Sequence, residues 1–94
     1  MNITELQMLY GAGERDFNHI DLSSTNLSCV DLQGVSLVRA NLRHANLRWT
    51  NLAQADLRWA DLRGADLSWA SLERADLSWA KLKGAKMPDG SIHG

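Results

Sequence analysis

The stretch ANLRHANLRWTNLAQADLRWADLRGADLSWASLERADLSWA, residues 40–80, repeats itself every five residues. The same pattern extends beyond this stretch in both directions. Every fifth residue from 22 to 82 is leucine, thirteen in succession, with Phe17 before them and Met87 after them. A small or β-branched residue precedes each of these leucines by two positions, and the residue between is usually Asp or Asn. This unbroken phase predicts a repeat architecture rather than an ordinary globular core.

A period of five fits neither common element of secondary structure. On an α-helix, five residues advance about 500°, so successive leucines would move around the axis by about 140° and share no face. In a flat strand, an odd period would send alternate leucines to opposite sides. A chain that bends once per repeat keeps every leucine, and the small residue two positions before it, in one interior. The chain is therefore predicted to coil.

Four of the repeats, ADLRW, ADLRG, ADLSW and ANLRH, carry a specific resemblance to the pentapeptide-repeat family. The resemblance covers residues 15–89. It implies an all-β solenoid, a right-handed quadrilateral β-helix of about four coils with four repeats in each coil. It also implies that the leucine and the residue two before it face inward while the other three positions face solvent. Arg15 departs from the pattern, because a small inward residue belongs at its position.

Residues 1–14 are predicted to form a short N-terminal capping α-helix and a turn. Thr4 and Gln7 have the spacing of a capping box, and Ile3 and Met8 have the spacing of a hydrophobic staple. The helix is expected from Thr4 to near Tyr10, ending at one of the glycines that follow. Its function would be to cover the open end of the coil, as capping segments do in solenoids. The apolar residues placed to do so are Leu6, Leu9 and Tyr10.

The C-terminal tail, residues 90–94, is predicted to be a weak cap. A PDG turn signal at residues 88–90 leads into this tail, which contains only a short Ser-Ile strand candidate. Because an uncovered end exposes unpaired backbone groups, that end could pair with a second copy to form a homodimer.

Composition and charge limit the cellular location and the kinds of partner that can be expected. The chain has 94 residues with a formal net charge of −1, which gives no general reason to expect nucleic acid or a membrane as partner. The single cysteine, Cys29, cannot form an internal disulfide, and no apolar stretch approaches the roughly 18 residues that cross a bilayer. A soluble protein of the cytoplasm is therefore expected.

Four tryptophans are predicted to form two columns on opposite faces of the coil. If each coil takes twenty residues, Trp49 lies over Trp69 and Trp59 lies over Trp79, all at the last position of their repeats. One interpretation is structural: the rings cover corners and stack on one another or on Arg39, which falls in the Trp59 column. The other is a docking surface for a protein, since tryptophan is enriched at binding hot spots. The sequence leaves both open.

A second candidate surface is the column formed by Arg43, Arg63 and Lys83 at the fourth position of their repeats. Such a stripe would suit an acidic partner or phosphates. Neighbouring carboxylates, such as Asp56, Asp61 and Asp66, offset part of its charge.

The sequence indicates no catalytic, cofactor or metal site. His19, His44 and His93 fall on different faces or in the tail, so they are not expected to share a metal ion. No serine has the surroundings of an activated nucleophile. The repeated Asp and Asn side chains are expected to bond backbone groups at the corners, as they do in turns.

The resulting functional prediction is a non-catalytic scaffold or protein-interaction module. Family resemblance supplies one alternative, a DNA-mimicking protein that binds and inhibits DNA gyrase. That alternative requires continuous negative faces, whereas residues 38–63 carry five arginines against two aspartates.

Overall fold

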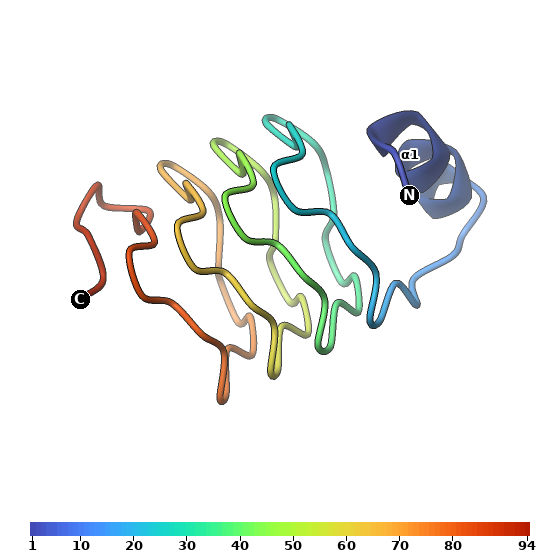
Figure 1. Cartoon of the computed structure of the whole chain (residues 1–94). Helices are drawn as coiled ribbons and strands as arrows, with labels where there is room; N and C mark the ends of the chain where they lie inside the picture. Colours follow the sequence, from blue (N-terminus) through green and yellow to red (C-terminus); the bar gives the residue numbers. More distant parts are fainter.

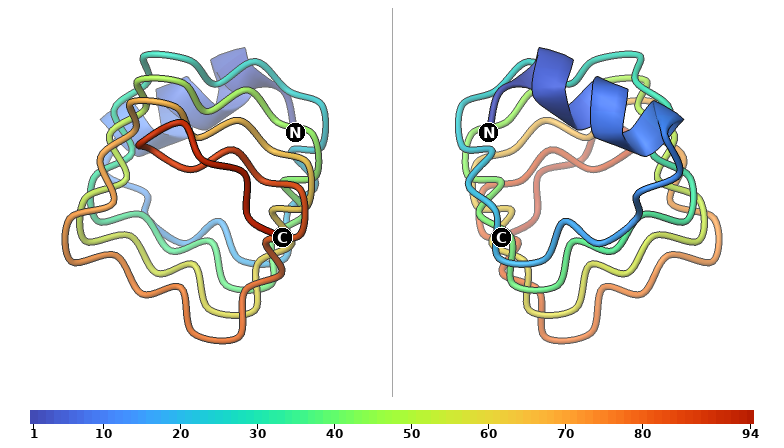
Figure 2. Two further views of the ribbon diagram at one scale, coloured as in Figure 1. Left: turned by 90° about the vertical axis from the view of Figure 1, so that its left-hand side faces the viewer. Right: turned by 90° about the vertical axis from the view of Figure 1, so that its right-hand side faces the viewer.

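The structure, a computed structural model, describes all 94 residues. Its one regular element is helix α1 (Ile3–Gly11), after which the chain winds around a single axis to its C-terminus (Figure 1). The molecule is elongated, with extents of 36 × 24 × 23 Å. Viewed along this axis, the successive coils lie over one another (Figure 2), and the two termini lie at opposite ends of the molecule (Figure 1).

The register of the coil is set by parallel backbone bridges between residues twenty apart. Eleven of these run from Asp16↔Ser36 to Asp66↔Lys86. Each is a single-residue bridge, because the chain turns every five residues and leaves no run long enough for a continuous strand. The expected β-structure is therefore present as a ladder of bridges rather than as strands. Twenty residues per coil correspond to four five-residue units, as the resemblance to the pentapeptide-repeat family implied.

Each five-residue unit ends in a tight turn that makes a corner of the coil. The amide of Ala40, for example, donates to the carbonyl of Leu37 at 3.1 Å. The third residue of these turns has positive φ, as a type II turn requires. Eleven residues other than glycine adopt φ between 53° and 65° at this position. The last position of every repeat from His19 to Gly84 is therefore a left-handed backbone site, which side chains other than glycine occupy at some cost.

The interior is a column of leucines with small residues between them. The leucines from Leu22 to Leu67 are buried, and so are most of the alanines two positions before them. Thr50 also fits this dry interior because its hydroxyl donates to the carbonyl of Leu27 at 2.7 Å. Burial weakens toward the C-terminal end, where the last four members are only partly buried: Leu72, Leu77, Leu82 and Met87.

Helix α1 lies across one side of the N-terminal end of the coil (Figure 2). Leu6 is completely buried against the core, and Leu9 and Tyr10 pack beside it, as expected. The predicted capping box is wrong: Asn2, not Thr4, is the N-cap residue, and its Oδ1 accepts from the amide of Glu5 at 2.8 Å. The helix therefore begins one residue earlier than predicted, and Met8 is exposed rather than stapled to Ile3.

The two flanks of the repeat region join the ladder in different ways. At the first repeat, Arg15 does not enter the core; its guanidinium lies 3.7 Å from the centre of the Tyr10 ring, while its carbonyl accepts from the amide of Ser36. At the other end, the tail folds back on the last coil through an antiparallel bridge between Lys86 and Ile92. Ile92 remains exposed, so this tail covers little of the core.

Candidate interaction surface

The four tryptophans form the two stacked pairs that the twenty-residue register predicts. Trp49 and Trp69 have ring centroids 5.3 Å apart with planes inclined by 9°, and Trp59 and Trp79 have centroids 5.5 Å apart with planes inclined by 12°. All four side chains remain exposed, from 45% for Trp59 to 74% for Trp79. The structure therefore places these rings side by side on the surface.

Each of these tryptophans occupies the left-handed backbone site of a corner. Their φ angles are 61° or 62°, a conformation in which a bulky residue is an outlier. Glycines hold the same corner position elsewhere in the coil, at Gly34, Gly64 and Gly84. Placing a side chain there costs about 1–2 kcal/mol relative to glycine, and a stacked aromatic pair returns about 0.5–1.5 kcal/mol. Seven other residues, from His19 to Arg74, share this conformation, so it does not by itself set the tryptophans apart.

Arg39 extends the second tryptophan column, as the register predicts. Its guanidinium carbon lies 5.0 Å from the centre of the Trp59 ring, within the range of a cation–π contact. This column therefore presents a cation and two indole rings in succession along one corner of the coil.

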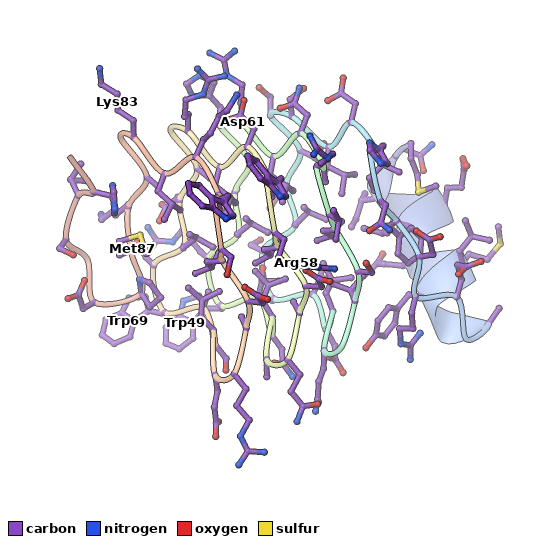
Figure 3. The ribbon with its side chains drawn as sticks, turned by 90° about the horizontal axis from the view of Figure 1, so that it is seen from below. Trp49, Arg58, Asp61, Trp69, Lys83 and Met87 are labelled. Atoms are coloured by element: carbon purple, nitrogen blue, oxygen red, sulfur yellow. The ribbon has the colours of Figure 1, made fainter.

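The predicted stripe of Arg43, Arg63 and Lys83 is present on the surface, but its members differ in their pairing. Arg63 forms an ion pair with Asp61, at 2.6 Å between the Nη2 and Oδ2 atoms. The side-chain hydrogen bond from Arg63 is the main reason that the pKa of Asp61 lies below its ordinary value of 3.8. Arg43 and Lys83 have no ion-pair partner. Figure 3 shows Lys83 and Asp61 on the opposite side of the coil from Trp49 and Trp69.

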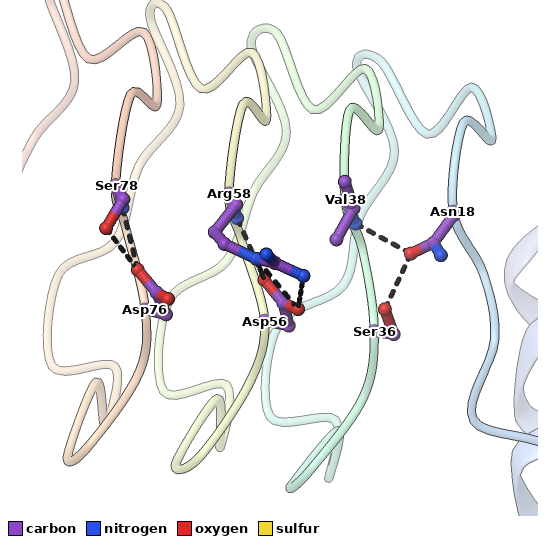
Figure 4. Close-up of polar contacts among 7 residues, drawn as sticks. All are labelled: Asn18, Ser36, Val38, Asp56, Arg58, Asp76 and Ser78. Carbon is purple, nitrogen blue, oxygen red and sulfur yellow. Dashed lines mark hydrogen bonds and ion pairs between the residues drawn. The ribbon is translucent and has the colours of Figure 1, made fainter.

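The repeated Asp and Asn side chains bond backbone amides at the corners, as predicted. In most repeats Oδ1 accepts from the amide two residues later, at 3.1 Å for Asn41 and Asn46. At Asp76 the carboxylate also accepts from the hydroxyl of Ser78, and at Asp56 it also accepts from the guanidinium of Arg58 (Figure 4). These bonds lower the pKa of both carboxyl groups below their ordinary value of 3.8. The carboxylates therefore have a structural role.

One corner contact was missed by reading the sequence. Ser36 stands where Asp or Asn is usual and cannot reach the amide of Val38 in the same way. Instead, Asn18 of the preceding coil supplies the acceptor: its Oδ1 accepts from the Val38 amide at 2.8 Å and from the Ser36 hydroxyl at 2.6 Å (Figure 4). The sequence did contain a signal for this contact. Serine replaces the usual Asp or Asn at position 36, and an asparagine stands about one coil earlier, at position 18.

Two shallow clefts accompany these surfaces. One, of about 300 Å³, is lined by the Trp69 ring together with Arg48, Ser68, Lys86 and the turn at Asp89 and Gly90. The other, of about 210 Å³, lies where helix α1 meets the first coil, beside Tyr10 and Val30.

The structure also shows how the titratable side chains are distributed. No group of three or more His, Cys, Asp or Glu side chains is gathered closely enough to hold a metal ion.

The chain contains no helix that is both long and apolar enough to span a bilayer.

Comparison with known proteins gives a consistent result. The sequence model described as "Pentapeptide repeats" matches residues 16–52 and 50–87 in eight copies. Among solved structures, the pentapeptide repeat protein alr5209 from Nostoc PCC 7120 is 47% identical, with a TM-score of 0.55 over 92% of this chain and 75% of that one. Rfr23 from the cyanobacterium Cyanothece 51142 is 41% identical, with a TM-score of 0.61 over 70% of this chain and 48% of that one.

A third similar structure is HetL from Nostoc sp. strain PCC 7120, a pentapeptide repeat protein involved in the regulation of heterocyst differentiation. It is 36% identical, with a TM-score of 0.48 over 85% of this chain and 50% of that one. The matches thus span three quarters of alr5209 and about half of Rfr23 and HetL. The comparison with curated proteins gave no match.

Proposed function

This chain belongs to the pentapeptide-repeat family, and from that premise we propose that it is a non-catalytic protein-interaction module that docks a partner through its exposed tryptophan columns. The scaffold in this proposal is a right-handed quadrilateral β-helix of about four coils, spanning residues 15–89. Its buried ladder fixes the corners, and the corners present side chains at a regular spacing. Recognition then depends on which side chains those corners carry.

The observation that carries this proposal is the exposure of four stacked tryptophans on the surface of the coil. Trp69 and Trp79 are among the most exposed large apolar side chains of the chain, and both occupy left-handed backbone sites. The backbone conformation itself does not require tryptophan, because seven other residues, from His19 to Arg74, adopt it at the same corner position. Large aromatic side chains are concentrated in protein-binding hot spots, where they bury wide, rigid surfaces at little entropic cost. A docking role accounts for the choice of large, exposed aromatic side chains at these corners.

The test is affinity capture from an extract of the cells that produce the protein. The parent chain is compared with a variant in which all four tryptophans are replaced by serine, the residue that Ser24 already places at such a corner. A matched control, Gln54→Ser with Arg74→Ser, alters one of the two corner columns that carry no tryptophan. A protein retained by the parent and the control but lost by the tryptophan variant would support the proposal. Equal retention by all three, or no specific retention, would contradict it.

The same experiment distinguishes the DNA-mimic alternative. If DNA gyrase is the protein retained, the module acts on that enzyme, and the supporting feature would have to be the carboxylates rather than the tryptophans. Capture of gyrase that persists in the tryptophan variant would then replace the proposed docking surface with an acidic one.

A further inference from the structure

We propose that, of the two tryptophan columns, Trp59 and Trp79 form the docking surface together with the basic face that follows them, and that the occupant is an acidic segment of a partner protein. The basic face is defined as residues 40–44, 60–64 and 80–84, which form one side of the last three coils. This inference rests on the proposed function and adds the location of the site and the chemistry of its partner.

The charge on the sides of the coil is unevenly distributed. The basic face carries four cationic side chains, Arg43, Arg63, Lys81 and Lys83, against the single carboxylate of Asp61. The next side, residues 45–49, 65–69 and 85–89, carries Arg48 and Lys86 against Asp66 and Asp89, so its charges balance. The positive and negative charges also balance on the two remaining sides. One consists of residues 50–54 and 70–74, and the other of residues 35–39, 55–59 and 75–79. The excess of positive charge is therefore confined to one side.

Most of the cations on the basic face are available to a ligand. Only Arg63 has an ion-pair partner, Asp61; Arg43, Lys81 and Lys83 have none. The side chains of these three residues also donate no hydrogen bond within the chain. Unpaired surface cations attract a negatively charged partner and accelerate its binding.

The basic face lies directly beside the Trp59–Trp79 column. Trp79 ends one side of the coil, and Lys81 and Lys83 follow it on the next. Lys83 is four positions after Trp79, so their backbones lie within about 14 Å of one another. Arg39 adds a further unpaired cation over the ring of Trp59. One short peptide can therefore contact the indole rings and the lysines at the same time.

The Trp49–Trp69 column has different surroundings. The cleft beside Trp69 contains Arg48 and Lys86, but Arg48 is paired with Asp66 at 3.4 Å, and Asp89 lines the same cleft. This column consequently has no net charge to select an acidic partner. It provides an internal control, since it has the same rings, the same stacking and the same backbone conformation.

A protein segment fits these features better than a nucleic acid. The excess of positive charge extends over three coils, which at about 4.8 Å between neighbouring chains is only about 10 Å. Toward the N-terminus, residues 1–37 carry Arg15 as their only Lys or Arg, against five Asp and Glu side chains. A long polyanion continuing along the coil would meet this acidic end and be repelled. An acidic segment with one apolar anchor matches the short basic face and the adjacent rings.

The experiment uses the tryptophans as reporters of their own surroundings. Trp49→Ser with Trp69→Ser leaves Trp59 and Trp79 as the only fluorophores of their kind, and Trp59→Ser with Trp79→Ser leaves the other pair. Both double variants are titrated with a short synthetic peptide in which glutamates alternate with alanines around one phenylalanine. A peptide with glutamine in place of glutamate and a thymidine oligonucleotide of equal charge serve as the comparison probes.

The expected result is a saturable change in the emission of the Trp59–Trp79 reporter with the glutamate peptide, and none with the Trp49–Trp69 reporter. Adding Lys81→Gln and Lys83→Gln should weaken that binding by about tenfold or more. The matched pair Arg48→Gln and Lys86→Gln removes the same charge from the neighbouring side and should change it by no more than about twofold.

Three results would overturn the inference: no saturable response to the glutamate peptide, equal responses from both reporters, or tighter binding of the oligonucleotide than of the peptide. These failures are distinguishable from failure of the proposed function. Capture of a partner that depends on the tryptophans can persist when the glutamate peptide does not bind, in which case only the assignment of the site and its acidic occupant is wrong.

Discussion

The leucine column inside the coil and the tryptophan columns outside it follow the same twenty-residue register in opposite environments. Leu57 is completely buried, whereas Trp79, which stacks on Trp59 with the same regularity, is 74% exposed. The inner column sets the register because burial of its side chains drives folding. The outer columns inherit that register without being needed to establish it. Regular spacing at a surface is therefore a consequence of the fold, and the choice of tryptophan there requires another explanation.

The largest effect is expected from Leu57→Ala in the middle of the inner column. Removing a fully buried leucine leaves a cavity between coils, so the free energy of unfolding should fall by about 2–5 kcal/mol. Urea unfolding followed by far-UV circular dichroism measures this change. Glu73→Ala, at an exposed position, is the control and should stay within about 0.5 kcal/mol of the parent. A loss below 1 kcal/mol at Leu57 would mean that the inner column does not hold the coil together.

A smaller effect is expected from Leu82→Ala near the C-terminal end of the same column. Leu82 is only partly buried, so its replacement should lower the free energy of unfolding by about 1 kcal/mol. The same urea titration applies. A loss equal to that of Leu57→Ala would indicate that this end is covered in solution, and dependence of the result on protein concentration would identify a second copy as the cover.

Acidification should destabilise the coil gradually. Hydrogen bonds from the side chains of Arg58 and Ser78 hold the pKa of Asp56 and of Asp76 below their ordinary value of 3.8. A carboxyl whose pKa is lower in the folded than in the unfolded state stabilises the fold above the unfolded pKa, and this contribution is lost as the pH falls through the folded pKa. The midpoint temperature of thermal unfolding should therefore be constant above about pH 5 and should decrease as the pH falls below 3.8, the ordinary pKa of the carboxyl group.

The control for this prediction is already present in the sequence. Asn41 and Asn46 make the same bond to the backbone without titrating, so Asp56→Asn with Asp76→Asn should give a shallower decline. A midpoint that rises on acidification would contradict the proposed role of these carboxylates.

Much of the fold is predictable because a single constraint, burial of every fifth residue, acts throughout residues 17–87. The resemblance to the pentapeptide-repeat family adds that each coil has twenty residues. The stacking of Trp59 on Trp79 and the position of Arg39 then follow, and the structure shows both. The Asx contacts at the corners are predictable for the same reason, since the bond is local to each repeat.

The features that were not predicted depend on contacts between neighbours that do not repeat. The helix begins at Asn2 because that side chain reaches the amide of Glu5, although Thr4 and Gln7 have the spacing of a capping box. Asn18 replaces the missing acceptor at Ser36 through a contact between coils. The pairing of Arg63 with Asp61 removes one cation from the expected stripe, while Lys81, which the sequence did not single out, remains unpaired. Such choices are decided by side-chain reach rather than by periodicity.

The most direct test of the central claim, that the tryptophan columns serve recognition rather than folding, is the free energy of unfolding of Trp59→Ser with Trp79→Ser, measured by urea titration and circular dichroism. The variant loses one aromatic stack and the Arg39 contact, both at the surface. The account predicts a decrease of about 1.5 kcal/mol or less, smaller than that of Leu57→Ala alone. A decrease of 3 kcal/mol or more would show that the rings hold the coil together and would contradict the account.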